Sequence, residues 1–142
     1  DYLHMHRYLR PAHRQAFPMR YAKSEDFIER KDHIISLLRH VEQMDLSEML
    51  AVIKDLGTRK DEVRDYIDLM VLWYRDVLLF KATKDINQLL FQDEASYISR
   101  EASHRSYEKI EEILQAFEKA KVRLRANVNF DITMELMLLT LK

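Results

Sequence analysis

Apolar residues recur every three to four positions in three long stretches of the chain, and this spacing predicts amphipathic helices. The stretches cover residues 24–43, 59–84 and 106–127. Ser24 suits the N-cap of the first helix, because its hydroxyl can accept a hydrogen bond from a free backbone N–H. The second stretch is the longest and predicts the central helix of the core. We therefore expect an all-α fold organised around these three helices.

Weaker signals fill the spaces between these stretches. Asp45 and Glu48 have the spacing of a capping box, and the apolar face that follows them ends at Gly57, which predicts a short second helix. Residues 85–105 are less periodic and indicate a loop that holds one or two short helices. Residues 1–23 contain both prolines and three of the six histidines, and we expect them to form a connector.

The end of the chain predicts a last helix that is apolar on nearly every side. Asn127 suits the left-handed conformation that ends a helix and Asn129 suits the next N-cap, so the last two helices should pack as an antiparallel pair. Ile132, Leu136 and Leu139 share one side of the last helix. Such a helix must be enclosed by the rest of the domain or covered on one side by another chain. Four more apolar residues cover much of the remaining surface: Met134, Met137, Leu138 and Leu141.

The composition agrees with an all-α domain and narrows the function. The chain has 142 residues, 47% of them hydrophobic, which is enough for one domain with a buried core. A single glycine cannot build a phosphate-binding loop, so no ATP site is expected here. Lys and Arg (23) nearly balance Asp and Glu (24), so no strong field attracts nucleic acid or a membrane. The absence of cysteines and of a signal peptide favours the cytoplasm.

No group of side chains in the sequence predicts catalysis or metal binding. His4, His6 and His13 lie close together, but no Cys or carboxylate completes a ligand set. His33 and His40 flank the apolar face of the first helix and are expected to be structural. Adjacent carboxylates on a helix point about 100° apart, so they do not converge on one site. We therefore expect no catalytic residue, no cofactor, no metal and no small-molecule substrate.

Two other functions stay open at this stage. A nucleic-acid-binding module could use the basic run of the third long helix, although glutamates on the same helix favour a charged outer face. A ligand-binding regulatory domain could have a methionine-lined cavity, although methionine more often fills a core. The residues concerned are Lys119, Lys121, Arg123 and Arg125 for the first function, and Met70, Met134 and Met137 for the second.

One side of the 59–84 helix combines leucines with charges. Asp68, Leu72, Arg75 and Leu79 lie opposite its main apolar stripe. Leucine beside arginine is typical of protein–protein interfaces, while two incidental exposed leucines are the alternative. All four are candidates for a subunit interface, and we expect Leu72, Arg75 and Leu79 to be partly exposed in the isolated chain and to contact a neighbouring subunit.

These elements together resemble the C-terminal domain of the bacterial DNA polymerase III delta-prime subunit, which is part of the clamp loader. The resemblance covers about residues 24–142. It is carried by the segment WYRDVLL at residues 73–79, the segment NVNF at residues 127–130 and the apolar tail. The motif positions are Trp73, Tyr74, Arg75, Asp76, Asn127 and Asn129.

The resemblance implies a non-catalytic role in DNA replication. In that family the domain is a bundle of about five helices that joins the matching domains of the delta and tau/gamma subunits in a circular collar. The collar holds the AAA+ modules that load the sliding clamp onto primed DNA. Residues 24–142 would then form a collar domain whose partners are the delta and tau/gamma subunits, with only indirect contact to DNA and the clamp. Residues 1–23 would be the end of the upstream AAA+ lid, although the glycines usual there are absent.

Overall fold

The computed structural model describes residues 25–142, and helices account for 86% of them. No strand occurs in this part of the chain, which confirms the all-α class. The expected connector at residues 1–23 and the cap at Ser24 lie outside the described residues. The α-helices are α1 (Glu25–His40), α2 (Leu46–Gly57), α3 (Val63–Thr83), α4 (Ala95–His104), α5 (Tyr107–Arg125) and α6 (Phe130–Leu141). Short 3₁₀ turns lie at Val41–Gln43, Lys60–Glu62, Ile86–Gln88 and Gln92–Glu94.

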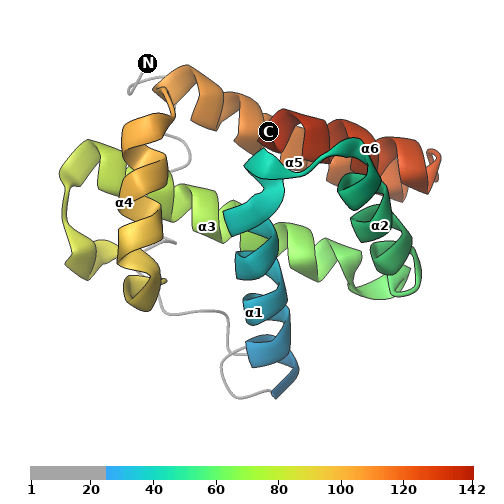
Figure 1. Cartoon of the computed structure of the whole chain (residues 1–142), viewed down its shortest axis with the longest axis horizontal. Helices are drawn as coiled ribbons and strands as arrows, with labels where there is room; N and C mark the ends of the chain where they lie inside the picture. Colours follow the sequence, from blue (N-terminus) through green and yellow to red (C-terminus); the bar gives the residue numbers. More distant parts are fainter. Residues whose placement is uncertain (1–24) are drawn as a thin grey trace.

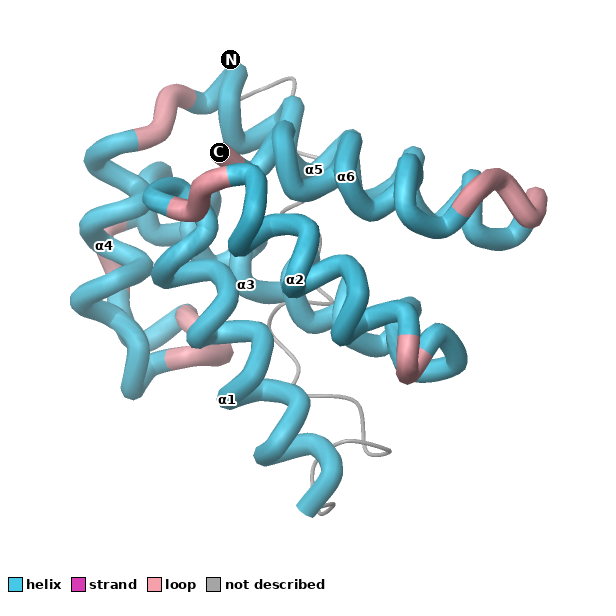
Figure 2. Tube along the Cα trace, turned by 45° about the vertical axis from the view of Figure 1, so that its right-hand side comes forward, coloured by secondary structure: helices cyan, strands magenta, loops and turns pink. Residues whose placement is uncertain are grey.

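Helix α3 is the central element, as its length and periodicity predicted. Helices α1, α4 and α5 all pack against it (Figure 1). Helix α5 runs antiparallel to α3, because Lys121 reaches Asp68 near the start of α3 while Lys81 near its end lies over the ring of Tyr107. Helix α6 folds back along α5 and also packs against α2 (Figures 1 and 2). The expected antiparallel pair of the last two helices is therefore confirmed.

The core is one continuous cluster of apolar side chains from all six helices. Ile67 and Val77 of α3, Phe117 of α5 and Leu138 of α6 are fully buried. The methionines considered as the lining of a ligand cavity are buried in the same cluster and fill the core. They are Met70, Met134 and Met137, exposed by 1%, 0% and 2%.

Local signals set most of the helix ends. The Asp45 carboxylate accepts a hydrogen bond from the Glu48 backbone N–H at 2.8 Å, which confirms the capping box. Asn127 is left-handed with φ 57°, and the Asn129 side-chain oxygen accepts from the N–H of Ile132 at 3.0 Å, as expected. Gly57 is the last residue of α2, but its φ is not positive, so the left-handed glycine that commonly ends a helix is absent here.

Candidate functional site

The segment Trp73–Asp76 of α3 contributes to the core through Trp73 and Asp76. The buried ring of Trp73 packs on Phe91 with 5.6 Å between ring centroids. The buried carboxylate of Asp76 accepts hydrogen bonds from the backbone N–H groups of Leu90 (3.1 Å) and Phe91 (2.8 Å). Burial raises the pKa of Asp76 to about 6, although these two donors favour the charged form and oppose the rise. The segment thus fixes the link between α3 and α4.

A second buried network ties α3 and α4 to α6. The Tyr74 hydroxyl donates to the Glu101 carboxylate at 3.3 Å, and burial raises the pKa of this hydroxyl well above its usual range. Arg105 donates to the same carboxylate at 3.2 Å and to the backbone oxygen of Leu141 at 2.7 Å. A guanidinium at the C-terminal end of α6 also interacts favourably with the helix dipole. The sequence did not point to Arg105, because its α6 partner lies 36 positions away.

The α3 face that the sequence singled out is mostly covered. Asp68 forms an ion pair with Lys121 of α5 at 2.8 Å. Leu72 and Arg75 are half-buried, and burial lowers the pKa of Arg75. Leu79 is only 4% exposed, so the expectation that it is partly exposed was wrong. The reason is that α3 has packing neighbours on several sides, which leaves little of its surface free.

Helix α6, in contrast, has an open apolar side. Ile132, Leu136 and Leu139 are 55%, 45% and 48% exposed. Leu138 and Leu141, on the opposite side, are fully buried. The sequence left two possibilities for this helix, complete enclosure by the domain or one side free for another chain. In the part of the chain that the structure describes, this side of α6 is exposed, which excludes complete enclosure by residues 25–142.

Helix α2 extends this open side. Leu46 and Leu50 are 59% and 49% exposed. The Lys142 amine donates to the backbone oxygen of Met44 at 2.6 Å, and Phe130 lies beside Gly57, so α2 and α6 run antiparallel in contact. This register places the two leucines next to the C-terminal half of α6. We call the five residues Leu46, Leu50, Ile132, Leu136 and Leu139 the α2/α6 apolar face.

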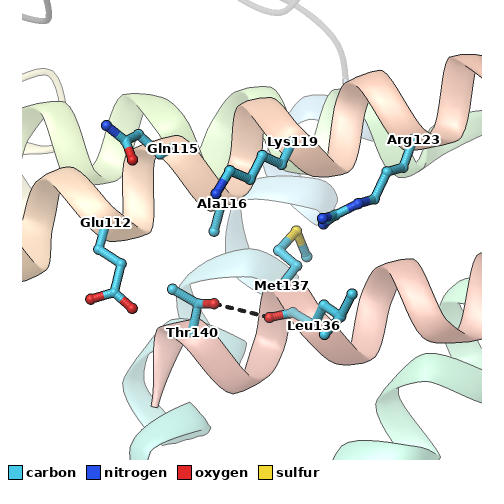
Figure 3. A pocket seen from close by; sticks show the side chains of 8 residues that line it. All are labelled: Glu112, Gln115, Ala116, Lys119, Arg123, Leu136, Met137 and Thr140. Atoms are coloured by element: carbon cyan, nitrogen blue, oxygen red, sulfur yellow. Dashed lines mark hydrogen bonds between the residues drawn. The ribbon is translucent and has the colours of Figure 1, made fainter.

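A groove between α5 and α6 borders this face. It encloses about 200 Å³, and Figure 3 shows Lys119 and Arg123 of α5 above Leu136 and Met137 of α6. Glu112 lies near Thr140 at the other end of the groove. Apolar side chains with charged groups at their border are the usual composition of a protein–protein interface. The remaining lining residues are Gln115 and Ala116.

The remaining polar candidates have local partners. His33 lies 3.7 Å from the Asp55 carboxylate, and His40 Nδ1 lies 2.7 Å from the backbone oxygen of Ser36. Across residues 25–142, no three His, Cys, Asp or Glu side chains gather in a way that could hold a metal ion. None of the helices in that range has the length and apolar character needed to cross a membrane. His4, His6 and His13 lie outside the described residues.

Comparison with known protein families identifies a match that covers most of the chain. The family described as DNA polymerase III, delta subunit, C terminal, matches residues 24–142. No curated protein and no solved structure shows significant similarity to the chain. The match names delta, whereas the motif resemblance pointed to delta-prime, so that finer assignment is corrected while the assignment to the clamp-loader family is confirmed.

The physical roles of the motif residues explain this correction. Trp73, Tyr74 and Asp76 hold the interior together, and Asn127 and Asn129 shape the link between two helices. Such residues specify a fold and carry little information about which member of the complex uses it. The fold and the family match together lead to one conclusion: the chain belongs to the family of C-terminal domains of DNA polymerase III delta subunits, which are parts of the clamp loader.

Proposed function

We propose that this chain is a non-catalytic assembly domain, which holds its subunit in the clamp-loader ring through the α2/α6 apolar face. The observation that carries the proposal is the open side of α6, where Ile132, Leu136 and Leu139 are each about half exposed. Contiguous exposed apolar side chains are uncommon on monomers and mark interaction sites. The match to a family of clamp-loader domains supports a protein partner for this face.

The energetics favour a partner at this position. Full burial of a leucine or isoleucine side chain contributes roughly 1.5–3 kcal/mol, so covering the exposed halves of five such residues favours association by several kcal/mol before its entropic cost. Leu136 lies both on the apolar face and in the charged groove beside it. A central residue of this kind is the expected energetic hot spot.

The partners follow from the same reasoning. The motif resemblance named the delta and tau/gamma subunits, and this chain itself matches delta, so we propose tau/gamma as the neighbour that covers the face. DNA and the sliding clamp would be reached indirectly, through AAA+ modules of the ring. Residues 24–142 would form the assembly domain, and residues 1–23 the end of an upstream lid. A clamp loader acts where the DNA is replicated, which places the proposed function in the cytoplasm.

A double substitution tests the proposal. The Leu136→Ala, Leu139→Ala variant should melt close to the parent and lose retention in a complex reconstituted with the other cognate clamp-loader subunits. The matched control is Ile28→Ala, Ile86→Ala, because these side chains are 59% and 48% exposed but belong to other surfaces. Equal retention of both variants would refute the assignment of the interface to this face.

The α3 face remains a second candidate surface, supported by one observation. Arg75 is half-buried, and the resulting desolvation lowers its pKa. Arginines in such positions are enriched at interface centres. Its candidate residues are now Leu72 and Arg75, since Asp68 is paired with Lys121 and Leu79 is buried.

A further inference from the structure

A small pocket lies where the end of α1 and α4 come together against α3 (Figure 1). It encloses about 30 Å³, which is room for one or two water-sized groups and far less than a whole small-molecule ligand needs. A pocket of this size admits only the end of a side chain or a group of similar size. Its lining includes Arg39, Glu42, Trp73, Tyr97, Arg100 and Glu101.

The indole of Trp73 brings a buried hydrogen-bond donor to this lining. Trp73 is 2% exposed, and its Nε1–H has no acceptor among the residues that the structure describes. Buried polar groups in proteins are almost always hydrogen-bonded, and the indole nitrogen can only donate. An acceptor that enters the pocket from outside the chain would complete this hydrogen bond.

The carboxylates of the lining have partners within the chain. Glu101 accepts hydrogen bonds from Tyr74 at 3.3 Å and from Arg105 at 3.2 Å. Glu42 lies 2.8 Å from Nε2 of His104. Because both carboxylates are engaged in this way, neither serves as the acceptor for the indole.

The two arginines of the lining differ in how they are held. Arg39 forms an ion pair with Glu94 and lies 3.9 Å from the centre of the Tyr97 ring. Arg100 is exposed, and within residues 25–142 no ion pair joins it to a carboxylate. The pocket therefore offers one positive charge and one indole N–H to the same small group. A carboxylate matches both, because it is negative and accepts several hydrogen bonds.

We propose that this pocket receives the carboxylate of an aspartate or glutamate side chain from a partner protein. The pocket admits only the end of that side chain, so the rest of the partner segment lies across the outer lining. Tyr97 is 37% exposed and Arg100 is exposed beside it, and both residue types are enriched at the centres of protein interfaces. The pocket shares no residue with the α2/α6 apolar face and forms a separate contact.

The single tryptophan of the chain makes the test direct. In an isotope-labelled sample of the whole chain, the one indole N–H signal in the NMR spectrum belongs to Trp73. This signal is followed at neutral pH, where glutamate is ionised, while the blocked tripeptide alanine-glutamate-alanine is added to millimolar concentrations at constant ionic strength. The blocked tripeptide alanine-glutamine-alanine is the neutral control. Acetate, added in a separate titration, represents a free small carboxylate.

Two single variants with equal charge change sharpen the test. Arg100→Gln removes the cation at the pocket, and Arg64→Gln removes an exposed arginine near the start of α3 as its matched control. Thermal melting verifies that both variants are folded. We expect a saturable shift of the indole signal with the glutamate peptide and little shift with the glutamine peptide. Arg100→Gln should weaken the apparent affinity roughly three- to fivefold, while the control stays within about 1.5-fold.

Four outcomes would overturn the proposal. An indole signal that stays in place at the highest peptide concentration would mean that water alone satisfies this N–H. Equal shifts with both peptides would point to a neutral acceptor, and equal weakening by both arginine substitutions would show attraction by net charge alone. A stronger response to acetate than to the glutamate peptide would assign the pocket to a free small carboxylate instead of a protein partner.

Discussion

The outward sides of α3 and α6 look alike in a helical projection and differ in the folded chain. Both carry leucines, yet Leu79 of α3 is 4% exposed whereas Leu136 and Leu139 of α6 are 45% and 48% exposed. Helix α3 packs against α1, α4 and α5, while the main α-helical neighbours of α6 are α5 and α2. A projection shows which residues share a side of a helix. The arrangement of neighbouring helices decides whether that side is free.

The comparison also separates two uses of leucine. On α3 the leucines contribute to the stability of the domain itself. On α6 one side does the same, and the other side has apolar surface that stays exposed among residues 25–142. Substitutions that distinguish stability from association can therefore test this contrast.

The largest effect is expected within α6 from two adjacent leucines. Leu138→Ala removes a fully buried side chain and should lower the free energy of unfolding by roughly 2–5 kcal/mol. Leu139→Ala, at 48% exposure, should lower it by less than about 1 kcal/mol. Thermal or urea unfolding of the two variants gives the comparison. Similar losses for both would mean that α6 is enclosed on all sides.

The next effect concerns Leu79, which was expected to be partly exposed and is buried in the structure. Leu79→Ala should destabilise the isolated chain by about 2–4 kcal/mol, because it leaves a cavity in a packed region. Urea unfolding measures this loss, and Ile86→Ala at an exposed position serves as its control. An unfolding curve that coincides with the parent curve would restore the α3 face as an open surface.

A smaller effect should appear as pH dependence through Asp76, the residue that fixes the α3–α4 link. Its folded pKa of about 6 lies above the usual 3.8, so the folded state binds this proton more tightly than the unfolded state. The resulting stabilisation is complete below the unfolded value and disappears as the pH rises through about 6. Between about pH 4.5 and 6.5 the change should be on the order of 1–2 kcal/mol.

The Asp76→Asn variant isolates this contribution. The asparagine side chain does not titrate. The unfolding free energy of the parent minus that of the variant should therefore increase as the pH falls over that interval. Other carboxylates titrate in both proteins and cancel in the difference. A difference that does not change with pH would mean that Asp76 has an ordinary pKa in the folded chain.

The smallest expected effect is on assembly through α3. Leu72→Ala, Arg75→Ala should reduce retention in the reconstituted complex less than the Leu136→Ala, Leu139→Ala variant does, because the α3 pair is already half-buried in the isolated chain. The Leu72→Ala, Arg75→Ala variant should also lose about 1 kcal/mol of unfolding free energy, because some packing is lost. If the α3 variant melts like the parent and is retained less in the complex than the α6 variant, the α3 face contributes more to assembly than the α2/α6 apolar face.

Features that depend on short-range physics could be predicted from the amino-acid sequence alone. Apolar spacing predicted the long helices, because one face of each helix must be buried wherever it packs. The capping box of Asp45 and Glu48, the left-handed Asn127 and the cap at Asn129 were predicted because each involves residues at most three positions apart or a single backbone conformation. The exception is Gly57, where glycine was present without the conformation it permits.

Which of these surfaces stay open, and which residues meet across the fold, depends on the packing of the helices in three dimensions. Arg105 reaches the end of α6 across 36 positions, and Asp76 accepts from backbone groups 14 and 15 positions away. The open side of α6 likewise exists because helices distant in sequence pack in one arrangement and leave this side uncovered. Contacts of this kind depend on the relative placement of whole helices, which periodicity within each helix does not specify.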